Sequence, residues 1–269
     1  MAITTVDGLI AGFKPAQFIQ KELSGTLVAG RSYTPFYAVG IPSAAVAPTP
    51  GISGAALTSY SGQIPFTNPS SGQNTYLARF SAFPTAQGGT IMLADRLWHN
   101  SGITITSTTA QTVNSVTFPA RDNNGSTNGE GVFLGVEVST ATGAGTPSIT
   151  IGYTNSDNTS GRTATNIYVT SATSAIGTFY PIGLESGDKG VRSIQSITLS
   201  ATWTSGTIHL VAYRPLVSIT SIGAGTSNTV DSLTGGLPRM YDNTVPFLIY
   251  TPNTTTSTGL IGTMTVTQG

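Results

Sequence analysis

Apolar and polar side chains alternate with a period of two along most of the chain beyond residue 88, and helical spacing is almost absent after Leu23. The clearest segment runs from residue 132 to residue 138. One of its faces carries four aliphatic side chains: Val132, Leu134, Val136 and Val138. The other face carries Phe133 and Glu137. Because successive side chains of a strand point to opposite faces, this pattern predicts a strand with one core face and one wetter face.

Clusters of Gly, Asn, Ser and Asp separate the alternating segments and predict turns. Between Gly88 and Pro215 they delimit about nine short strands, with none of the helical segments that a parallel α/β sheet requires. The sequence therefore predicts an all-β fold, an antiparallel jelly-roll-like β-sandwich. We expect both tryptophans, Trp98 and Trp203, to lie in its core.

The chain divides into three parts by its pattern. Residues 1–57 are predicted to form an extended N-terminal arm and a Pro/Ala-rich connector, residues 58–216 the β-sandwich domain, and residues 217–269 a short β extension. Within the arm, the segment from Asp7 to Leu23 fits either a short helix capped by Asp7 or an extended arm. The C-terminal extension is short for an independent domain, so it either adds strands to the sandwich or reaches a neighbouring subunit.

Composition supports a folded chain. Its 269 residues are 38% hydrophobic with a mean hydropathy of +0.11, which separates the chain from disordered sequences of similar Gly, Pro, Ser and Thr content. A chain of this size buries roughly 70% of its extended surface on folding. It contains no cysteine, so disulfides, thiolate metal sites and thiol nucleophiles are excluded.

Charge narrows the possible partners. Eleven basic and eleven acidic residues give a net charge of zero, which provides no basic field for phosphates, so we expect no nucleic-acid binding. No segment approaches the ~18 apolar residues of a membrane-spanning helix. The first thirteen residues lack the features of a secretory signal, and we expect a protein that stays soluble where it is made.

Few residues suggest catalysis or metal binding. Asp95 and His99 form the densest cluster, as a possible metal-chelating or acid–base pair, but a third ligand is missing; a strand end anchored by Trp98 is the alternative. His209 fits a structural histidine on a strand face. A hydrolase would need Glu130 or Glu137 aligned with Asp122. We therefore expect neither an enzyme nor a cofactor.

The loop from Asp122 to Glu130 has oxygen-bearing side chains at alternating positions, as calcium loops do. Its glycines do not match an EF-hand, and no helices are expected beside it. The sequence leaves two interpretations open, a calcium site and a plain hairpin loop.

Several stretches resemble structural proteins encoded in the virion gene clusters of tailed bacteriophages. These stretches are Leu27-Val-Ala-Gly-Arg31, Ala47-Pro-Thr-Pro-Gly51, Leu93-Ala-Asp-Arg-Leu-Trp-His-Asn-Ser-Gly102 and Gly190-Val-Arg-Ser-Ile-Gln-Ser-Ile-Thr-Leu-Ser-Ala-Thr-Trp203. The resemblance implies a virion component made in the host cytoplasm, and a capsid decoration (cement) protein fits the length and composition best. A tail or fibre protein that binds carbohydrate, with Trp98, Trp203 and the tyrosines as stacking residues, is the alternative.

This resemblance implies the major capsid protein as partner and a homo-oligomer, most simply a trimer. An apolar cluster in the N-terminal arm is the expected interface: Leu9, Ile10, Phe13, Phe18 and Ile19. Next to a Pro/Ala-rich connector that cannot form its own core, these side chains need a surface to cover them.

Overall fold

A computed structural model describes residues 3–23 and 25–269. Apart from one short α-helix and one turn of 3-10 helix, the regular elements in this part of the chain are strands, and all their pairings are antiparallel. The predicted all-β antiparallel fold class is confirmed. The eight strands between Gly88 and Pro215 are close to the predicted number, because Gly and Asn occupy the left-handed turn positions that separate them.

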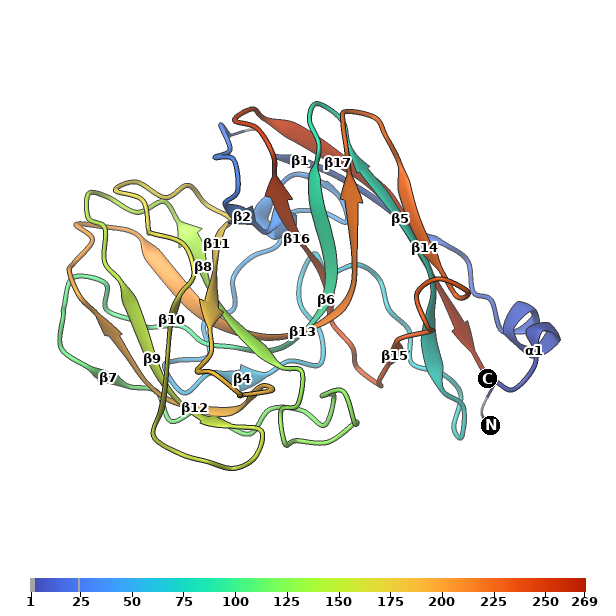
Figure 1. Cartoon of the computed structure of the whole chain (residues 1–269), viewed down its shortest axis with the longest axis horizontal. Coiled ribbons are helices and arrows are strands. Elements are labelled where there is room, and N and C mark those ends of the chain that lie inside the picture. Colours follow the sequence, from blue (N-terminus) through green and yellow to red (C-terminus); the bar gives the residue numbers. More distant parts are fainter. Residues whose placement is uncertain (1–2, 24) are drawn as a thin grey trace.

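Six strands close into a barrel at the centre of the molecule (Figure 1). Around the ring they are β2 (Ser32–Tyr33), β16 (Pro246–Pro252), β6 (Gly89–His99), β13 (Thr207–Ser221), β8 (Phe133–Thr140) and β11 (Thr178–Gly183). The ring closes because Tyr33 of β2 pairs both with Tyr250 and with Thr178. Aromatic rings of Phe179, Tyr213 and Phe247 meet edge-on or tilted inside it.

Two further layers pack on opposite sides of the barrel. On one side the large sheet continues through β10 (Arg162–Asn166), β9 (Ile149–Asn155), β12 (Val191–Leu199) and β7 (Gln111–Thr112), with the two-residue β4 (Ala55–Ala56) paired to β6. The core between this layer and the barrel contains both tryptophans and the aliphatic face of β8, and Trp98, Trp203, Val132, Leu134 and Val136 are each 0% exposed.

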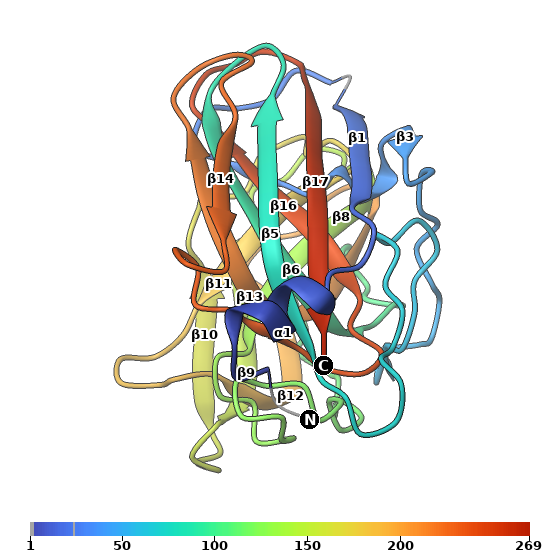
Figure 2. The ribbon, with the colours of Figure 1, turned by 90° about the vertical axis from the view of Figure 1, so that its right-hand side faces the viewer.

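The second layer is a separate sheet, which we call the outer sheet. Its strands are β14 (Asn228–Asp231), β5 (Thr75–Pro84), β17 (Thr258–Gln268), β1 (Gln17–Leu23) and β3 (Gly40–Ile41), with β15 (Arg239–Met240) paired to β5. Its inner face packs on β6, β13 and β16 through side chains such as Ile19, Phe80 and Met264. Figure 2 looks onto its outer face, which only helix α1 (Val6–Ala11) crosses, at one end.

The predicted division at residues 57 and 216 does not separate independent bodies. Strand β13 runs through residue 216, and β1 lies beside β17, so both ends of the chain share one sheet. Of the alternatives for the C-terminal residues, the structure shows the first: β16 and β17 add strands to the barrel and the outer sheet. The sequence does not indicate that β1 and β17 pair, because these two strands lie at opposite ends of the chain.

The N-terminal segment combines a short helix, as one alternative predicted, with a strand that is paired in the outer sheet. Helix α1 ends at Ala11, with Thr5 rather than Asp7 as its N-cap, and the chain continues as strand β1. The 3-10 turn η1 (Pro35–Tyr37) then inserts Phe36 into the barrel. Within residues 3–23 and 25–269, no helix has the length and hydropathy needed to cross a bilayer.

Candidate assembly surface

The middle of the outer sheet's outer face carries no charged side chains. Strand pairing aligns two neighbouring rows of side chains across β3, β1, β17 and β5. The first row is Ile41, Gln20, Ile261 and Phe83, and the second is Phe18, Thr263 and Ser81. None of these seven positions carries a charge, and Phe18 and Ile41 are 45% and 52% exposed. Four of these side chains are apolar, and exposed apolar side chains on an uncharged face are typical of an interaction surface.

Helix α1 is fastened to one end of this face. The Thr267 hydroxyl donates to the Leu9 carbonyl at 2.9 Å, and the Gln268 and Lys14 amides bond to the Gly12 and Val266 carbonyls, also at 2.9 Å. With its backbone held in this way, the segment directs the Ile10 and Phe13 side chains outward, where 58% and 46% of their surface is exposed.

The predicted interface cluster is therefore split by the structure. Ile10, Phe13 and Phe18 are exposed and Leu9 is half-buried, but Ile19 is 1% exposed and belongs to the core under the outer sheet. Its assignment to an interface is wrong, because alternation along β1 directs Phe18 and Ile19 to opposite faces. Gln20, Ile41, Ile261 and Phe83 were missed, since only strand register brings them beside Phe18.

The barrel interior contains a charged cluster that the sequence did not reveal. Arg96 of β6 and Glu137 of β8 form a hydrogen-bonded ion pair with both side chains 0% exposed, and the Tyr37 hydroxyl donates to Glu137 at 2.7 Å. The Arg96 guanidinium also lies 4.8 to 4.9 Å from the ring centroids of Phe36, Tyr60 and Phe247. The expectation of a wetter face at Glu137 is wrong, because that face of β8 lines a closed barrel.

The two histidines lie next to this cluster. Their ring centroids are 4.5 Å apart, His99 Nδ1 is 3.1 Å from an Arg96 nitrogen, and His209 Nδ1 is 2.6 Å from the Asn100 carbonyl. Burial, with the positive charge of Arg96 and the neighbouring His209, holds the pKa of His99 well below its usual value, and burial also lowers the pKa of His209. Both are buried and face the barrel rather than solvent.

Asp95 and His99 do not form the metal-chelating or acid–base pair that was considered possible. Both Asp95 carboxylate oxygens accept hydrogen bonds from the Arg121 guanidinium, at 2.9 and 3.2 Å. One of them also accepts a hydrogen bond from the Val245 amide at 2.9 Å. Asp95 thus anchors the 121–130 loop and the start of β16 to β6. Among the described residues, no group of three His, Asp or Glu side chains is arranged to hold a metal ion.

The loop from Asp122 to Glu130 is closed by its own hydrogen bonds. The Asp122 carboxylate accepts the amides of Asn124, Ser126 and Gly129 and the Ser126 hydroxyl, at 2.7 to 3.0 Å. Partial burial alone would raise the pKa of Asp122, but these donors lower it. Because the carboxylate oxygens face N–H and O–H groups, the arrangement fits a hairpin loop rather than a cation site.

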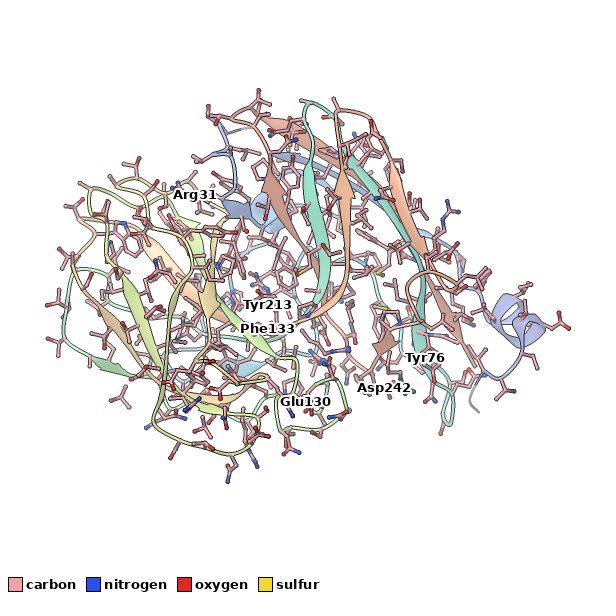
Figure 3. The ribbon with its side chains drawn as sticks, in the orientation of Figure 1. Arg31, Tyr76, Glu130, Phe133, Tyr213 and Asp242 are labelled. Carbon is pink, nitrogen blue, oxygen red and sulfur yellow. The ribbon has the colours of Figure 1, made fainter. Side chains whose placement is uncertain are left out.

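The three acids considered for hydrolysis do not converge. Glu137 is inside the barrel with Arg96, Asp122 binds its own loop, and Glu130 accepts the Asn124 side-chain amide at 2.9 Å. Figure 3 labels Glu130 in this loop and Phe133, the first residue of β8. No pair of these carboxylates is arranged for acid–base work.

The tryptophans are unavailable for stacking on a sugar. Trp98 and Trp203 are each 0% exposed, and their indole N–H groups donate to the Ser53 and Ser171 carbonyls at 3.2 and 3.1 Å. The two tyrosines near β15 are engaged within the fold as well. The Arg239 guanidinium lies 5.3 Å from the ring centroids of both Tyr76 and Tyr241. Figure 3 shows Tyr76 and Asp242 in this region.

Comparison with known proteins leaves the family open. No family model matches the chain, and no curated protein matches it significantly. Solved structures of infectious bursal disease virus are among those that it matches. The Gt strain structure is 12% identical, with 95% of this chain and 82% of that chain covered and a TM-score of 0.16. The VP2 subviral particle of this virus is 10% identical, with 95% of this chain and 81% of that chain covered and a TM-score of 0.18. Scores this low carry no argument about fold or function.

Proposed function

We propose that this chain is a structural virion protein that decorates or cements a phage capsid, with the outer face of its outer sheet against the major capsid protein. The observation that carries the proposal is that uncharged face, with Phe18 and Ile41 exposed on it. Each large aliphatic or aromatic side chain covered by a partner contributes roughly 1.5–3 kcal/mol. A repeating shell presents the same partner surface many times, which suits a rigid β scaffold.

The remaining side chains support a role in assembly rather than in chemistry. The acids and histidines considered for catalysis are engaged with arginines, backbone amides or carbonyls of their own fold. The tryptophans considered for carbohydrate recognition are buried. We therefore prefer capsid decoration to a carbohydrate-binding tail or fibre protein.

The test is binding of the purified chain to capsids that lack it, followed by imaging of the particles. We expect saturable binding at regular positions on the outer shell. The double variant Phe18→Asp/Ile41→Asp should lose binding while its unfolding midpoint stays unchanged. The matched control is Ile167→Asp/Val169→Asp, which alters two side chains that are 59% and 78% exposed beyond β10. Equal binding by both variants, or a position on the tail, would contradict the proposal.

A further inference from the structure

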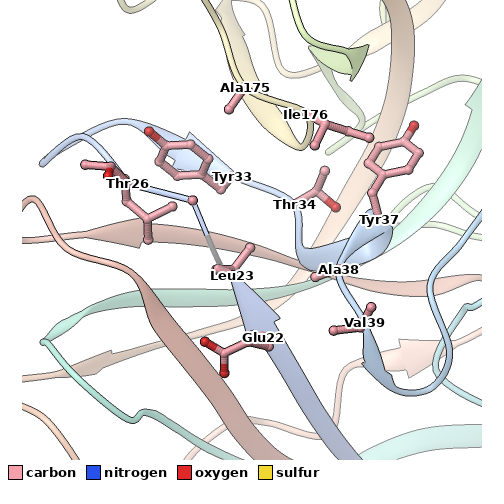
Figure 4. Close-up of a pocket in the computed structure, with 12 residues that line it drawn as sticks. Glu22, Leu23, Thr26, Tyr33, Thr34, Tyr37, Ala38, Val39, Ala175 and Ile176 are labelled. Atoms are coloured by element: carbon pink, nitrogen blue, oxygen red, sulfur yellow. The ribbon is translucent and has the colours of Figure 1, made fainter.

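A groove runs across one end of the outer sheet, opposite to α1. It consists of two adjoining hollows of about 260 and 370 Å³, which share Glu22 and Val39 as lining residues. The first hollow lies between β1, the 33–39 segment and the 175–176 turn (Figure 4). The second continues over Gly40, Ile41 and Ile261 onto the outer face. Each hollow is of the size that takes one or two side chains.

The walls of the groove are mainly apolar, and its rim is exposed. Val39 and Ile176 are 67% and 53% exposed on the two sides of the first hollow, while Leu23, Leu27 and Tyr33 form its buried floor. Figure 4 shows Tyr33 and Leu23 facing Tyr37 and Ala38 across the hollow, with Ile176 above them. The groove therefore favours an apolar segment of a partner.

Glu22 contributes a charge where the two hollows meet. Its side chain is exposed and forms no ion pair within residues 3–23 and 25–269. It lies over Gly259, where an added methyl group would come within 3.0 Å of Glu22 Oε2. A ligand that fits this groove thus combines an apolar body with one positive charge.

Lys21, the preceding residue, gives the groove a fixed wall. Its ammonium is turned to the inner face of the sheet, where it donates to the Ala38 and Ser43 carbonyls at 3.2 and 3.0 Å. These bonds hold the 38–43 loop beside β1, and burial lowers the pKa of Lys21 to about 8. The groove is therefore preformed, which reduces the entropy lost on binding.

The same chain presents the complementary chemistry at the other end of its outer sheet. Ile10 and Phe13 are exposed, and the exposed Lys14 follows them and forms no ion pair in the described part of the chain. The other exposed lysine, Lys189, lies in a Gly/Ser/Asp turn, and its large exposed apolar neighbour is Phe133, which lines the same hollow. Lys14 is thus the exposed lysine that lies next to two exposed apolar side chains, Ile10 and Phe13.

The segment cannot reach the groove of its own copy. Its backbone is bonded to the end of β17, and the seven residues of β1 span roughly 20 Å between the two sites. Figure 2 shows α1 at one end of the outer sheet and β3 near the other. Contact between the two sites therefore requires a second molecule.

We infer that the groove at Glu22 binds the Ile10–Lys14 segment of a second copy of this chain, with Lys14 of one copy paired to Glu22 of the next. The inference rests on the proposed assembly role and names the contact between neighbouring copies. Donor and acceptor surfaces differ, so the contact can repeat head-to-tail in a ring, as in the predicted trimer, or occur twice across the axis of a two-fold dimer.

The test is sedimentation velocity of the full-length free protein over a range of concentrations. We expect the wild type to form a discrete oligomer, and Glu22→Lys and Lys14→Glu each to weaken association roughly tenfold or more, because each places like charges together. The double variant Lys14→Glu/Glu22→Lys should restore association. Asp157→Lys and Lys189→Glu are matched controls at exposed positions, and their association should equal that of the wild type.

Each outcome decides the inference. A wild type that stays monomeric, single variants that associate like the controls, or a double variant as weak as the singles would overturn it. Circular dichroism and the unfolding midpoint establish that every variant is folded. The experiment contains no capsid and therefore measures self-association alone. Failure of self-association would overturn this inference, whereas failure of particle binding would overturn the proposed function, so the two failures are distinguishable.

Discussion

The barrel and the outer sheet use the same kind of strand in opposite ways. Both faces of the barrel strand β8 are buried from Leu134 to Val138, so even its charged residue, Glu137, is enclosed and paired with Arg96. In β1 of the outer sheet, Ile19 and Leu23 are buried while Phe18, Gln20 and Glu22 are exposed. Closure determines the difference, because a barrel strand packed on by a further layer has no free face and the outer sheet has one.

This difference indicates where function is expected. In the barrel, buried polar groups are costly. Arg96, Glu137 and Tyr37 bond to one another, while Arg96 Nε and the Nε2 atoms of both histidines have no hydrogen-bond partner among the described residues. On the outer sheet, uncompensated apolar and charged side chains lie at the surface. Changes in the barrel should therefore alter folding, and changes on the outer face should alter association.

The largest effect is expected from deletion of residues 1–40. This removes β1, which is paired with β17, and β2, which closes the barrel, together with Ile19, Tyr33 and Phe36 from the cores. We expect no cooperative thermal unfolding transition for the truncated chain. Deletion of residues 1–13, which spares both strands, should leave a folded protein. A folded 41–269 fragment would show that these strands are accessory.

Arg96→Met is expected to destabilise the fold by about 3–5 kcal/mol, because it leaves the Glu137 carboxylate buried without its partner. The double variant Arg96→Met/Glu137→Met removes both charges and should cost less than the single variant. Urea unfolding measures both. If the double variant were the less stable of the two, the Glu137 carboxylate would stabilise the barrel even without Arg96.

Acidification is expected to destabilise the barrel below pH 6.5. The folded pKa values of His99 and His209 are lowered, so the unfolded chain binds more protons, and stability falls as the pH drops below the unfolded value of 6.5. The loss is at most about 1.4 kcal/mol per pH unit for each histidine. Unfolding free energies at pH 7.5, 6.5 and 5.5 measure it. A His99→Gln variant should show a shallower slope, and an equal slope would exclude His99 as a cause.

The smallest effect on stability is expected for Phe18→Ala, within about 0.5 kcal/mol, because the ring is on an uncovered face. Trp203→Ala, a truncation in the core, should cost about 3–5 kcal/mol. Thermal unfolding of the two variants compares the two environments directly. A loss for Phe18→Ala similar to that for Trp203→Ala would mean that the outer face is covered within the same molecule.

Alternation in the sequence was sufficient to predict strands and one of the cores. The face of Val132, Leu134 and Val136 follows from a period of two. The alternation expected up to Trp203 ends at Leu199 with β12, and Trp203 is buried beyond the strand. Barrel closure could not be predicted, because it depends on β2, a strand of two residues with no period to detect. For the same reason Glu137 was expected to face water, and its pairing with Arg96 depends on contacts distant in sequence.

The candidate surface was predictable only in part. Apolar side chains near residue 10 stood out in a segment without a core of its own, but local sequence did not distinguish Phe18 from Ile19. The groove depends on residues from β1, the 38–43 loop and the 175–176 turn. No local signal links these three segments, and only the folded chain places Glu22 between apolar walls.

The most direct test of the central claim, that assembly covers the outer face of the outer sheet, uses the absence of cysteine. Gln20→Cys places a single thiol on that face, and Thr165→Cys places one at an exposed position on β10 in the opposite layer. Alkylation rates are compared for the free chain and for the chain bound to capsids. We predict that binding slows modification of Gln20→Cys roughly tenfold or more, as expected for a buried interface, and leaves Thr165→Cys unchanged. Protection of Thr165→Cys alone, or of neither thiol, would contradict the account.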